Sequence, residues 1–379
     1  MKIVSVITGI GYGHTIREAA ILNELEKKEA EIIIASYGNA LEYFRHVYKT
    51  LEIDGPKLPE KNSRFSTMKT ILINLKLPYF YTKNYFRLKR LFSAFNPDAI
   101  ITDFEPLPLF VEKNRLHFLI FNFDPLQYKK YVKEKRKRFW AQSKYISLVY
   151  NRAKNISAQI IIPAFEKHER DEFKQNEYNF INPIVRKLPK QSQKELLEKF
   201  NLKKPPIIIM FGGSHFSTEL LYRLQEILPK IDEEFIIFTY KISGDSHDNI
   251  TFLPFKENFL EYLKTSKGII SQAGHVILSE AIALKKPSLL FPIPNFIEQE
   301  LNAYFAKKYG IAVVEENKNY TDSELMSIIN NFIGKIPELE KSLEKLSIEI
   351  NGAEQAASII EKSISAKQQV DKQNKSQAV

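Results

Sequence analysis

Residues 271–303 read SQAGHVILSEAIALKKPSLLFPIPNFIEQELNA, and this stretch decides how we interpret the rest of the chain. An apolar run at 268–270 precedes it, and apolar residues then recur at helical spacing from Val276 to Leu284. Pro287 ends this predicted helix, and a second buried strand follows at 288–291. The order strand, small-residue turn, helix, strand is typical of a parallel sheet, in which the turn and helix N-terminus form an anion site.

The turn of this unit leaves its backbone open to a ligand. Ala273 and Gly274 carry no bulky side chain, so backbone N–H groups there can approach a phosphate. Glu280 lies just over one turn into the helix. The loop at 292–299 then carries three side chains suited to hydroxyl groups: Asn295, Glu298 and Gln299.

The order of these residues resembles a known family. The pattern S-x-A-G-H, then S-E-A, then K-x-P, then a P-x-P loop ending E-Q-x-x-N-A is similar to the donor-binding region of GT-B glycosyltransferases. The best match is the family-28 type, which includes the N-acetylglucosaminyltransferase of peptidoglycan synthesis and archaeal relatives. The resemblance implies an α/β fold of two Rossmann-like domains, whose parallel sheets face across a cleft, with a C-terminal helix crossing back to the first domain.

Composition sets the outer limits. The chain has 379 residues, which suits two domains, and a net charge of +10, which favours an anionic partner. It has no cysteine, which excludes disulfides and thiolate metal sites. No apolar run reaches the length of a membrane span, and the apolar start at 1–10 is interpreted as a strand, not a signal peptide. We expect a cytoplasmic protein, with peripheral contact to the inner face of the cell membrane as a candidate.

A glycine-rich turn follows the first predicted strand. Lys2–Thr8 is apolar and β-branched, and a helix is predicted from about Thr15 to Lys28. Gly11 and Gly13 lie between them, where glycine allows positive φ and close backbone approach. His14 follows, either as a helix cap or as a functional residue. In the resembled family this loop faces the acceptor and the donor diphosphate, and its histidine is functional, so the resemblance favours the second interpretation.

Asp103 ends the strand predicted at 99–102. A carboxylate at the carboxyl end of a parallel strand is well placed for chemistry. In inverting enzymes of the wider GT-B group, an aspartate near this strand end orients the catalytic histidine, and Asp103 matches it. A helix cap or a turn carboxylate is an equally good interpretation from the residues alone.

A basic and aromatic segment follows at 127–144, QYKKYVKEKRKRFWAQSK. On a helix it predicts a basic surface with aromatic anchors, which suits anionic lipid headgroups. A solvated charged helix is the alternative. Nucleic acid is the least favoured partner, because it leaves the donor motif unexplained.

The predicted domain boundaries follow composition and the resemblance. An N-terminal acceptor-side domain covers 1–181, a linker 182–204, the nucleotide-sugar domain 205–345, a returning helix 346–365, and a polar tail 366–379 is predicted to be disordered. Arg186 matches a family arginine near the donor phosphates. A second phosphate-binding turn is expected at Gly212, Gly213 and Ser214, and Phe255 is placed against the nucleotide base.

The resemblance also implies the chemistry. His14 would act as general base oriented by Asp103, Glu280 would hold the ribose hydroxyls, and His275 would lie against the diphosphate. Glu298 and Gln299 match the pair that contacts the sugar hydroxyls. Uridine is implied as the base, so the donor is a UDP-sugar and the acceptor a glycan or lipid-linked hydroxyl. No D-x-D motif occurs, so no obligatory metal or other cofactor is expected.

Two alternatives to an inverting glycosyltransferase stay open at this point. A non-hydrolysing UDP-N-acetylglucosamine 2-epimerase shares the GT-B architecture, although the His14 loop fits it less well. A non-catalytic nucleotide-sugar-binding protein would have little use for His14, Glu280 and Gln299 together. The sequence names neither the acceptor nor the sugar.

Overall fold

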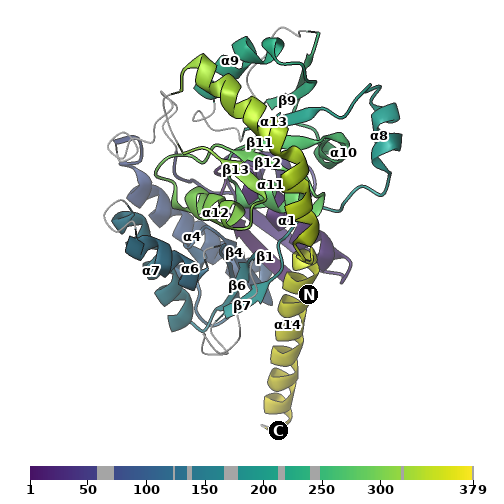
Figure 1. The fold of residues 1–379 in the computed structure, drawn as a ribbon. Helices are drawn as coiled ribbons and strands as arrows, with labels where there is room; N and C mark the ends of the chain where they lie inside the picture. Colours follow the sequence, from purple (N-terminus) through teal and green to yellow (C-terminus); the bar gives the residue numbers. More distant parts are fainter. Residues whose placement is uncertain are drawn as a thin grey trace. The chain divides into compact units, whose positions relative to one another are not determined.

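The computed structural model describes residues 1–57, 72–122, 124–134, 139–165, 178–211, 218–239, 248–316 and 320–377. These residues form two compact α/β units (Figure 1). The first unit holds the chain up to Val185 together with the C-terminal segment from Glu349, and the second runs from Arg186 to Ile348. Within the described ranges, the chain therefore passes from the first unit to the second after Val185 and returns to the first at its end.

The first unit is built on a seven-stranded parallel sheet with strand order β3-β2-β1-β4-β5-β6-β7. Its strands are β1 (Lys2–Ile7), β2 (Glu31–Ser36), β3 (Lys49–Glu52), β4 (Ala99–Asp103), β5 (Leu116–Ile120), β6 (Gln159–Pro163) and β7 (Tyr178–Ile181). Its helices are α1 (Gly13–Glu26), α2 (Gly38–Phe44), α4 (Leu77–Phe95), α5 (Pro108–Val111), α6 (Pro125–Glu134), α7 (Trp140–Asn155) and α14 (Gly352–Gln377).

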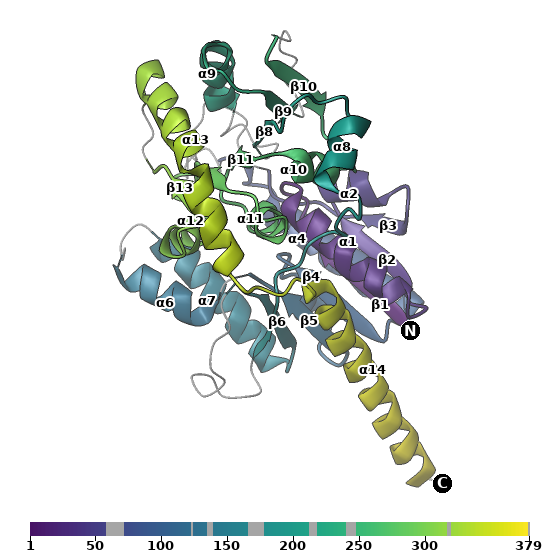
Figure 2. The ribbon, with the colours of Figure 1, turned by 45° about the vertical axis from the view of Figure 1, so that its right-hand side comes forward.

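Strand periodicity decides which helix packs on which face of this sheet. Ile3 and Ile7 of β1 point to the face covered by α1 and α14, whereas Val4 and Val6 point to the face covered by α4. Ser5 therefore lies on the α1 face. Figure 2 shows α14 alongside α1, and its buried residues are Ala356, Ala357, Ile360 and Ile364.

The strand order reverses between β1 and β4, because the chain runs β1, β2, β3 to one side and then continues on the other. Ile7 pairs with Asp103 at the carboxyl ends of these two strands. Ligands of open parallel sheets bind outside the strand ends at such a reversal. The fold thus brings the loop after β1 to the end of β4.

The second unit repeats this plan with a six-stranded parallel sheet of order β10-β9-β8-β11-β12-β13. Its strands are β8 (Ile207–Met210), β9 (Phe235–Thr239), β10 (Ile250–Pro254), β11 (Gly268–Ser271), β12 (Ser288–Leu290) and β13 (Ala312–Val314). Its helices are α8 (Gln193–Lys199), α9 (Thr218–Ile227), the 3₁₀ turn η3 (Leu228–Lys230), α10 (Phe259–Thr265), α11 (His275–Ala283), α12 (Ile297–Lys308) and α13 (Asp322–Lys345). The order reverses between β8 and β11, so the 272–274 turn lies at the reversal.

Several elements differ from the sequence expectation. The prediction of a disordered tail from 366 is wrong for residues 366–377, which continue α14. A helix whose first turns are docked is extended at little cost by good helix formers such as Lys, Gln and Ala. The expected linker at 182–204 contains α8, whose Ser192 and Glu195 form a capping box. The short strands β3 and β7 were not expected.

Candidate functional site

The loop between β1 and α1 depends on its glycines in different ways. Gly11 has φ +72°, which a residue with a side chain rarely adopts. Gly13 opens α1, and a Cβ atom there would meet nothing within 4 Å. A Cβ on Gly9 would lie 1.7 Å from the carbonyl oxygen of Tyr37, so the loop is tight at its start and open near α1.

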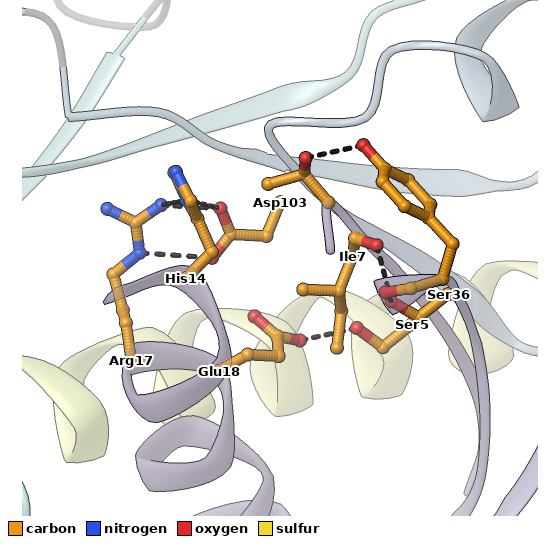
Figure 3. A network of polar contacts seen from close by, with 9 residues as sticks. Ser5, Ile7, His14, Arg17, Glu18, Ser36 and Asp103 are labelled. Carbon is orange, nitrogen blue, oxygen red and sulfur yellow. Dashed lines mark hydrogen bonds and ion pairs between the residues drawn. The ribbon is translucent and has the colours of Figure 1, made fainter. Parts of the chain in front are cut away.

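His14 and Asp103 lie together, as the sequence predicts, and Arg17 joins them (Figure 3). The His14 Nδ1 atom lies 2.9 Å from Asp103 Oδ1. Arg17 Nε donates to Asp103 Oδ2 at 3.0 Å, and its Nη2 donates to Oδ1. Asp103 is fully buried and the Arg17 side chain is 2% exposed, whereas the His14 side chain is 15% exposed. Of the three, His14 is therefore the group that solvent reaches.

The surroundings of Asp103 keep it ionised. Burial alone opposes its charge, but the Arg17 guanidinium and then His14 outweigh that cost and hold the pKa of Asp103 below its ordinary value. Phe104, the next residue, has φ +56° and packs its ring 4.8 Å from the His14 ring. The backbone strain at Phe104 accompanies an aromatic wall beside the histidine.

A second carboxyl group, Glu18, lies one helical position beyond Arg17. It is fully buried and accepts a hydrogen bond from the Ser5 hydroxyl (Figure 3). Burial, followed by the charge of Asp103, raises the pKa of Glu18 to about 8. Glu18 is therefore protonated at neutral pH.

In the second unit, the turn before α11 has the form that the sequence predicts. Ala273 is buried, Gly274 is the N-cap residue, and His275 begins the helix and is 4% exposed. The Ala273 carbonyl oxygen accepts a hydrogen bond of 2.9 Å from the Asn302 amide of α12. The turn is thereby tied to the next helix, while the N–H groups at the start of α11 point out of the helix end.

Arg186 and Glu280 also come together. Arg186 Nε and Nη2 donate to the two oxygens of Glu280 at 2.7 and 2.9 Å. Glu280 is 1% exposed and Arg186 is 18% exposed. The guanidinium also lies over the Phe259 ring and lines a shallow pocket of about 160 Å³ that includes Asn258 and Glu261.

The loop before α12 is held by its own polar groups. Gln299 Oε1 accepts from the backbone N–H of Ile293, and Glu300 accepts from the backbone N–H of Asn295, which has φ +66°. Glu298 lies in the first turn of α12. Gln299 thus shapes the loop through its carbonyl oxygen and keeps two amide hydrogens for another partner.

The predictions for Phe255 and for the turn at 212–214 stay predictions. Phe255 is half-buried against the core of the second unit that contains Phe238 and Phe259. Gly212, Gly213 and Ser214 lie outside the described residues. Within the described ranges, no group of three or more His, Asp or Glu side chains is arranged to hold a metal ion.

Three of the aromatic side chains in the basic segment at 127–144 do not contribute to the predicted surface. The segment splits between α6 and α7, and Tyr128, Tyr131 and Phe139 are buried, at 5%, 8% and 0% exposure. Residues at i and i+3 share a helix face, so the two tyrosines anchor α6 to the core and do not point outward. Residues 135–138, which hold part of the basic run, lie outside the described residues. Within the described part of the chain, no helix is both long and apolar enough to cross a bilayer.

Three residues that organise these sites have no role in the sequence-based prediction. Arg17 looks like a solvent-facing charge on α1, although its i+3 spacing from His14 is a signal that the two side chains share a face. Asn302 lies in the family-like motif without a predicted role. Glu300 is adjacent to Gln299, but the motif assigns the sugar contact to Glu298.

The chain is similar to known glycosyltransferases along most of its length. Residues 1–337 match the model of a family described as glycosyl transferase family 1. The chain is 27% identical over 395 residues to an uncharacterised glycosyltransferase of Methanosarcina acetivorans, covering 97% of this chain and 100% of the relative. It is 23% identical over 198 residues to the UDP-N-acetylglucosamine--N-acetylmuramyl-(pentapeptide) pyrophosphoryl-undecaprenol N-acetylglucosamine transferase of Acetivibrio thermocellus, covering 47% of this chain and 53% of the relative.

The fold is also similar to solved structures. Spinosyn rhamnosyltransferase SpnG complexed with thymidine diphosphate matches with a TM-score of 0.63 and 15% identity, covering 96% of this chain and 99% of that chain. Together with the two parallel-sheet units, this confirms the predicted GT-B fold. The predicted resemblance to GT-B glycosyltransferases is confirmed by the family match and by both named relatives.

Proposed function

The chain belongs to glycosyl transferase family 1, and from this membership we propose an inverting enzyme that moves a sugar from a UDP-sugar to a hydroxyl acceptor. The sugar is a hexose or an N-acetylhexosamine. The observation that carries the proposal is the 2.9 Å contact between His14 Nδ1 and the buried Asp103 carboxylate. A base held by a carboxylate on one nitrogen presents its other nitrogen to a substrate.

The proposed reaction is a single displacement. The Nδ1–H of His14 donates to Asp103, and Nε2 accepts the proton of the acceptor hydroxyl as its oxygen bonds to the anomeric carbon. The bond from that carbon to the diphosphate oxygen breaks, and the nucleoside diphosphate leaves with the electron pair. One base acting on the acceptor side inverts the configuration at the anomeric carbon.

The second unit supplies the groups proposed for the donor. The N-terminus of α11 at Gly274 and His275 suits a diphosphate, and Arg186 adds a positive charge. Each Glu280 oxygen accepts one hydrogen bond from Arg186, which leaves each oxygen a further lone pair for a ribose hydroxyl. Glu298 and Gln299 are proposed to contact the sugar. With these dipoles and charges we propose that no metal ion is obligatory.

A lipid-linked acceptor would bring the protein to an anionic membrane, and the support for that contact lies on the first unit. Large apolar side chains are exposed before and along α4, at 62% for Leu72, 66% for Leu75, 67% for Tyr79 and 63% for Phe86. The same segment also carries exposed basic residues, namely Lys76, Lys89 and Arg90. An apolar surface with interspersed cations suits the interface of an anionic bilayer.

Calorimetric titration of UDP, UDP-N-acetylglucosamine, UDP-glucose and thymidine diphosphate tests the donor site, with EDTA present throughout. Glu280→Gln should weaken UDP binding at least tenfold, because a ribose hydroxyl pair loses a charged acceptor. Glu226→Gln, an exposed carboxylate on α9, is the matched control and should bind as the wild type does. If no uridine ligand binds at millimolar concentration, or if Glu280→Gln binds normally, the donor assignment is wrong.

Turnover separates the remaining alternatives. Release of UDP that requires an added acceptor supports transfer, and a His14→Ala variant should then lose about 100-fold or more in rate. Interconversion of UDP-sugars without acceptor would favour the epimerase. Binding of UDP-sugars without any turnover would favour a binding protein.

A further inference from the structure

Three atoms meet at the base of the His14 ring. His14 Nδ1 lies 2.9 Å from Asp103 Oδ1 and also 2.9 Å from Arg17 Nη2, and Arg17 Nη2 itself donates to Asp103 Oδ1. The Nδ1 atom cannot be a donor to Asp103 and an acceptor from Arg17 in one tautomer. The choice decides whether Nε2 is free to take a proton.

The buried carboxylate favours one of the two tautomers. An ionised carboxylate is a stronger acceptor than a ring nitrogen, and Asp103 is fully buried, so each N–H that reaches it gains a charge-assisted hydrogen bond. Arg17 already donates to both Asp103 oxygens through Nε and Nη2. The arrangement of lowest energy therefore places the proton on Nδ1, where it points at Asp103. Arg17 donates the other hydrogen bonds to this carboxylate.

We propose that Arg17 is a positioning residue that keeps His14 neutral, by sharing the negative charge of Asp103 that would otherwise hold a second proton on the imidazole ring. This inference rests on the proposed role of His14 as the base. A base must be unprotonated before the acceptor binds. A buried carboxylate without Arg17 would favour the imidazolium ion, which cannot accept a proton.

The charges around the ring support this arrangement. Among the described residues, the titratable groups that interact with His14 or its partners are Asp103 at the end of β4, and Arg17 and Glu18 on α1. Asp103 and Arg17 cancel, and the buried Glu18 carries a proton at neutral pH, so the cluster has no net charge when His14 is neutral. A proton on His14 would add an uncompensated charge to a largely buried cluster.

Nitrogen NMR of the full chain, labelled at its seven histidines, measures the ring directly. His14→Gln identifies the His14 signals by their loss. In the wild type we expect the neutral form of the ring to carry its proton on Nδ1. In Arg17→Gln the titration midpoint of that ring should move upward by about one pH unit or more. Arg17→Lys retains the charge and should move the midpoint less.

A double variant separates charge from folding. Asp103→Asn combined with Arg17→Gln removes both charges together, so the midpoint should return toward the wild-type value even though both hydrogen-bonding partners have changed. If Arg17→Gln does not fold, Arg17→Lys and the double variant still provide the comparison. An Nε2–H tautomer in the wild type, or a midpoint that Arg17→Gln leaves in place, would overturn the proposal.

These results are independent of turnover, so the two proposals fail in distinguishable ways. Full transfer activity in His14→Ala would reject the proposed role of His14 as the base. The NMR result would still describe the protonation of the His14 ring. Loss of activity in His14→Ala with an unmoved midpoint in Arg17→Gln would keep the base and reject the role of Arg17. If both proposals hold, the acidic limb of the rate profile moves to higher pH in Arg17→Gln.

Discussion

Each unit contains an arginine that holds a buried carboxylate with hydrogen bonds to both oxygens, and the two pairs differ in how far water reaches them. Arg17 and Asp103 are 2% and 0% exposed, whereas Arg186 and Glu280 are 18% and 1% exposed. The first pair is enclosed and has His14 as its neighbour. In the second pair only the arginine lines a shallow pocket, and its guanidinium lies over the Phe259 ring.

The difference indicates different uses of the same contact. A closed pair cannot change partners without stranding a charge, so it is suited to fixing the position and protonation of the group beside it. An open pair can share its arginine with an incoming anion, since water already reaches the guanidinium. We therefore expect changes in the first pair to affect folding and the base, and changes in the second to affect donor binding.

The largest expected effect compares Asp103→Asn with Glu280→Gln. Asp103→Asn strands the buried Arg17 and should lower the free energy of unfolding of the first unit by about 3–5 kcal/mol. Glu280→Gln should cost about 1–2 kcal/mol, because Arg186 can hydrate from the pocket. Urea unfolding followed by fluorescence of Trp140, the single tryptophan, measures the first unit, and hydrogen exchange in α10 and α11 measures the second. Equal losses would remove the distinction between closed and open pairs.

The protonated Glu18 beside the closed pair predicts a pH dependence. Its pKa is raised to about 8 in the folded chain, so folding keeps a proton that the unfolded chain releases above its ordinary value of 4.5. The free energy of unfolding should therefore fall as pH rises from about 4.5 to 8, by about 4 kcal/mol from this group. Glu18→Gln should flatten that fall, and Glu24→Gln on the same helix should not. A Glu18→Gln curve parallel to the wild type would show that Glu18 is ionised in the fold.

How far the sequence predicts these two sites depends on where their partners lie in the chain. Glu280 was identifiable because it stands in a run of motif residues, and Arg186 because it matches an element before the second domain. Arg17 carries no such pattern. Its burial follows from the arrival of β4 beside β1, 86 residues later, and a helix with charges between apolar positions does not reveal that neighbour.

The same reasoning explains the error at 127–144. Tyr128 and Tyr131 stand among lysines, and composition alone predicts an aromatic and basic surface. Their i, i+3 spacing was the better signal, because it places both on the buried face of α6. The order of the other strands was predictable because buried parallel strands are continuous apolar runs. The edge strands β3 and β7 were not, because they are short and partly polar.

Substitutions at the glycines of the two turns test the same comparison, with smaller expected effects on stability. Gly9→Ala should destabilise the first unit by about 1–3 kcal/mol, because the new Cβ would lie 1.7 Å from the Tyr37 carbonyl oxygen. Gly13→Ala, with nothing within 4 Å, is the control in the same loop. Gly274→Ala meets only Ile277 Cγ2 at 3.6 Å, so it should leave stability within about 0.5 kcal/mol and weaken UDP binding. Normal UDP binding by Gly274→Ala would argue against a phosphate at that turn.

The last comparison concerns Asn302, which ties the turn before α11 to α12. Its amide donates 2.9 Å to the Ala273 carbonyl oxygen, and both residues are buried. Asn302→Ala should cost about 1 kcal/mol in the second unit, because one buried hydrogen bond is lost. If the donor binds to a turn that is already ordered, UDP affinity should fall several-fold in Asn302→Ala. That loss is larger than the small decrease in the folded fraction can explain. Hydrogen exchange at 271–278 and calorimetry on the same sample measure the two effects together. A loosened turn with unchanged affinity would mean that the donor orders the turn itself, and that the open pair alone fixes the nucleotide.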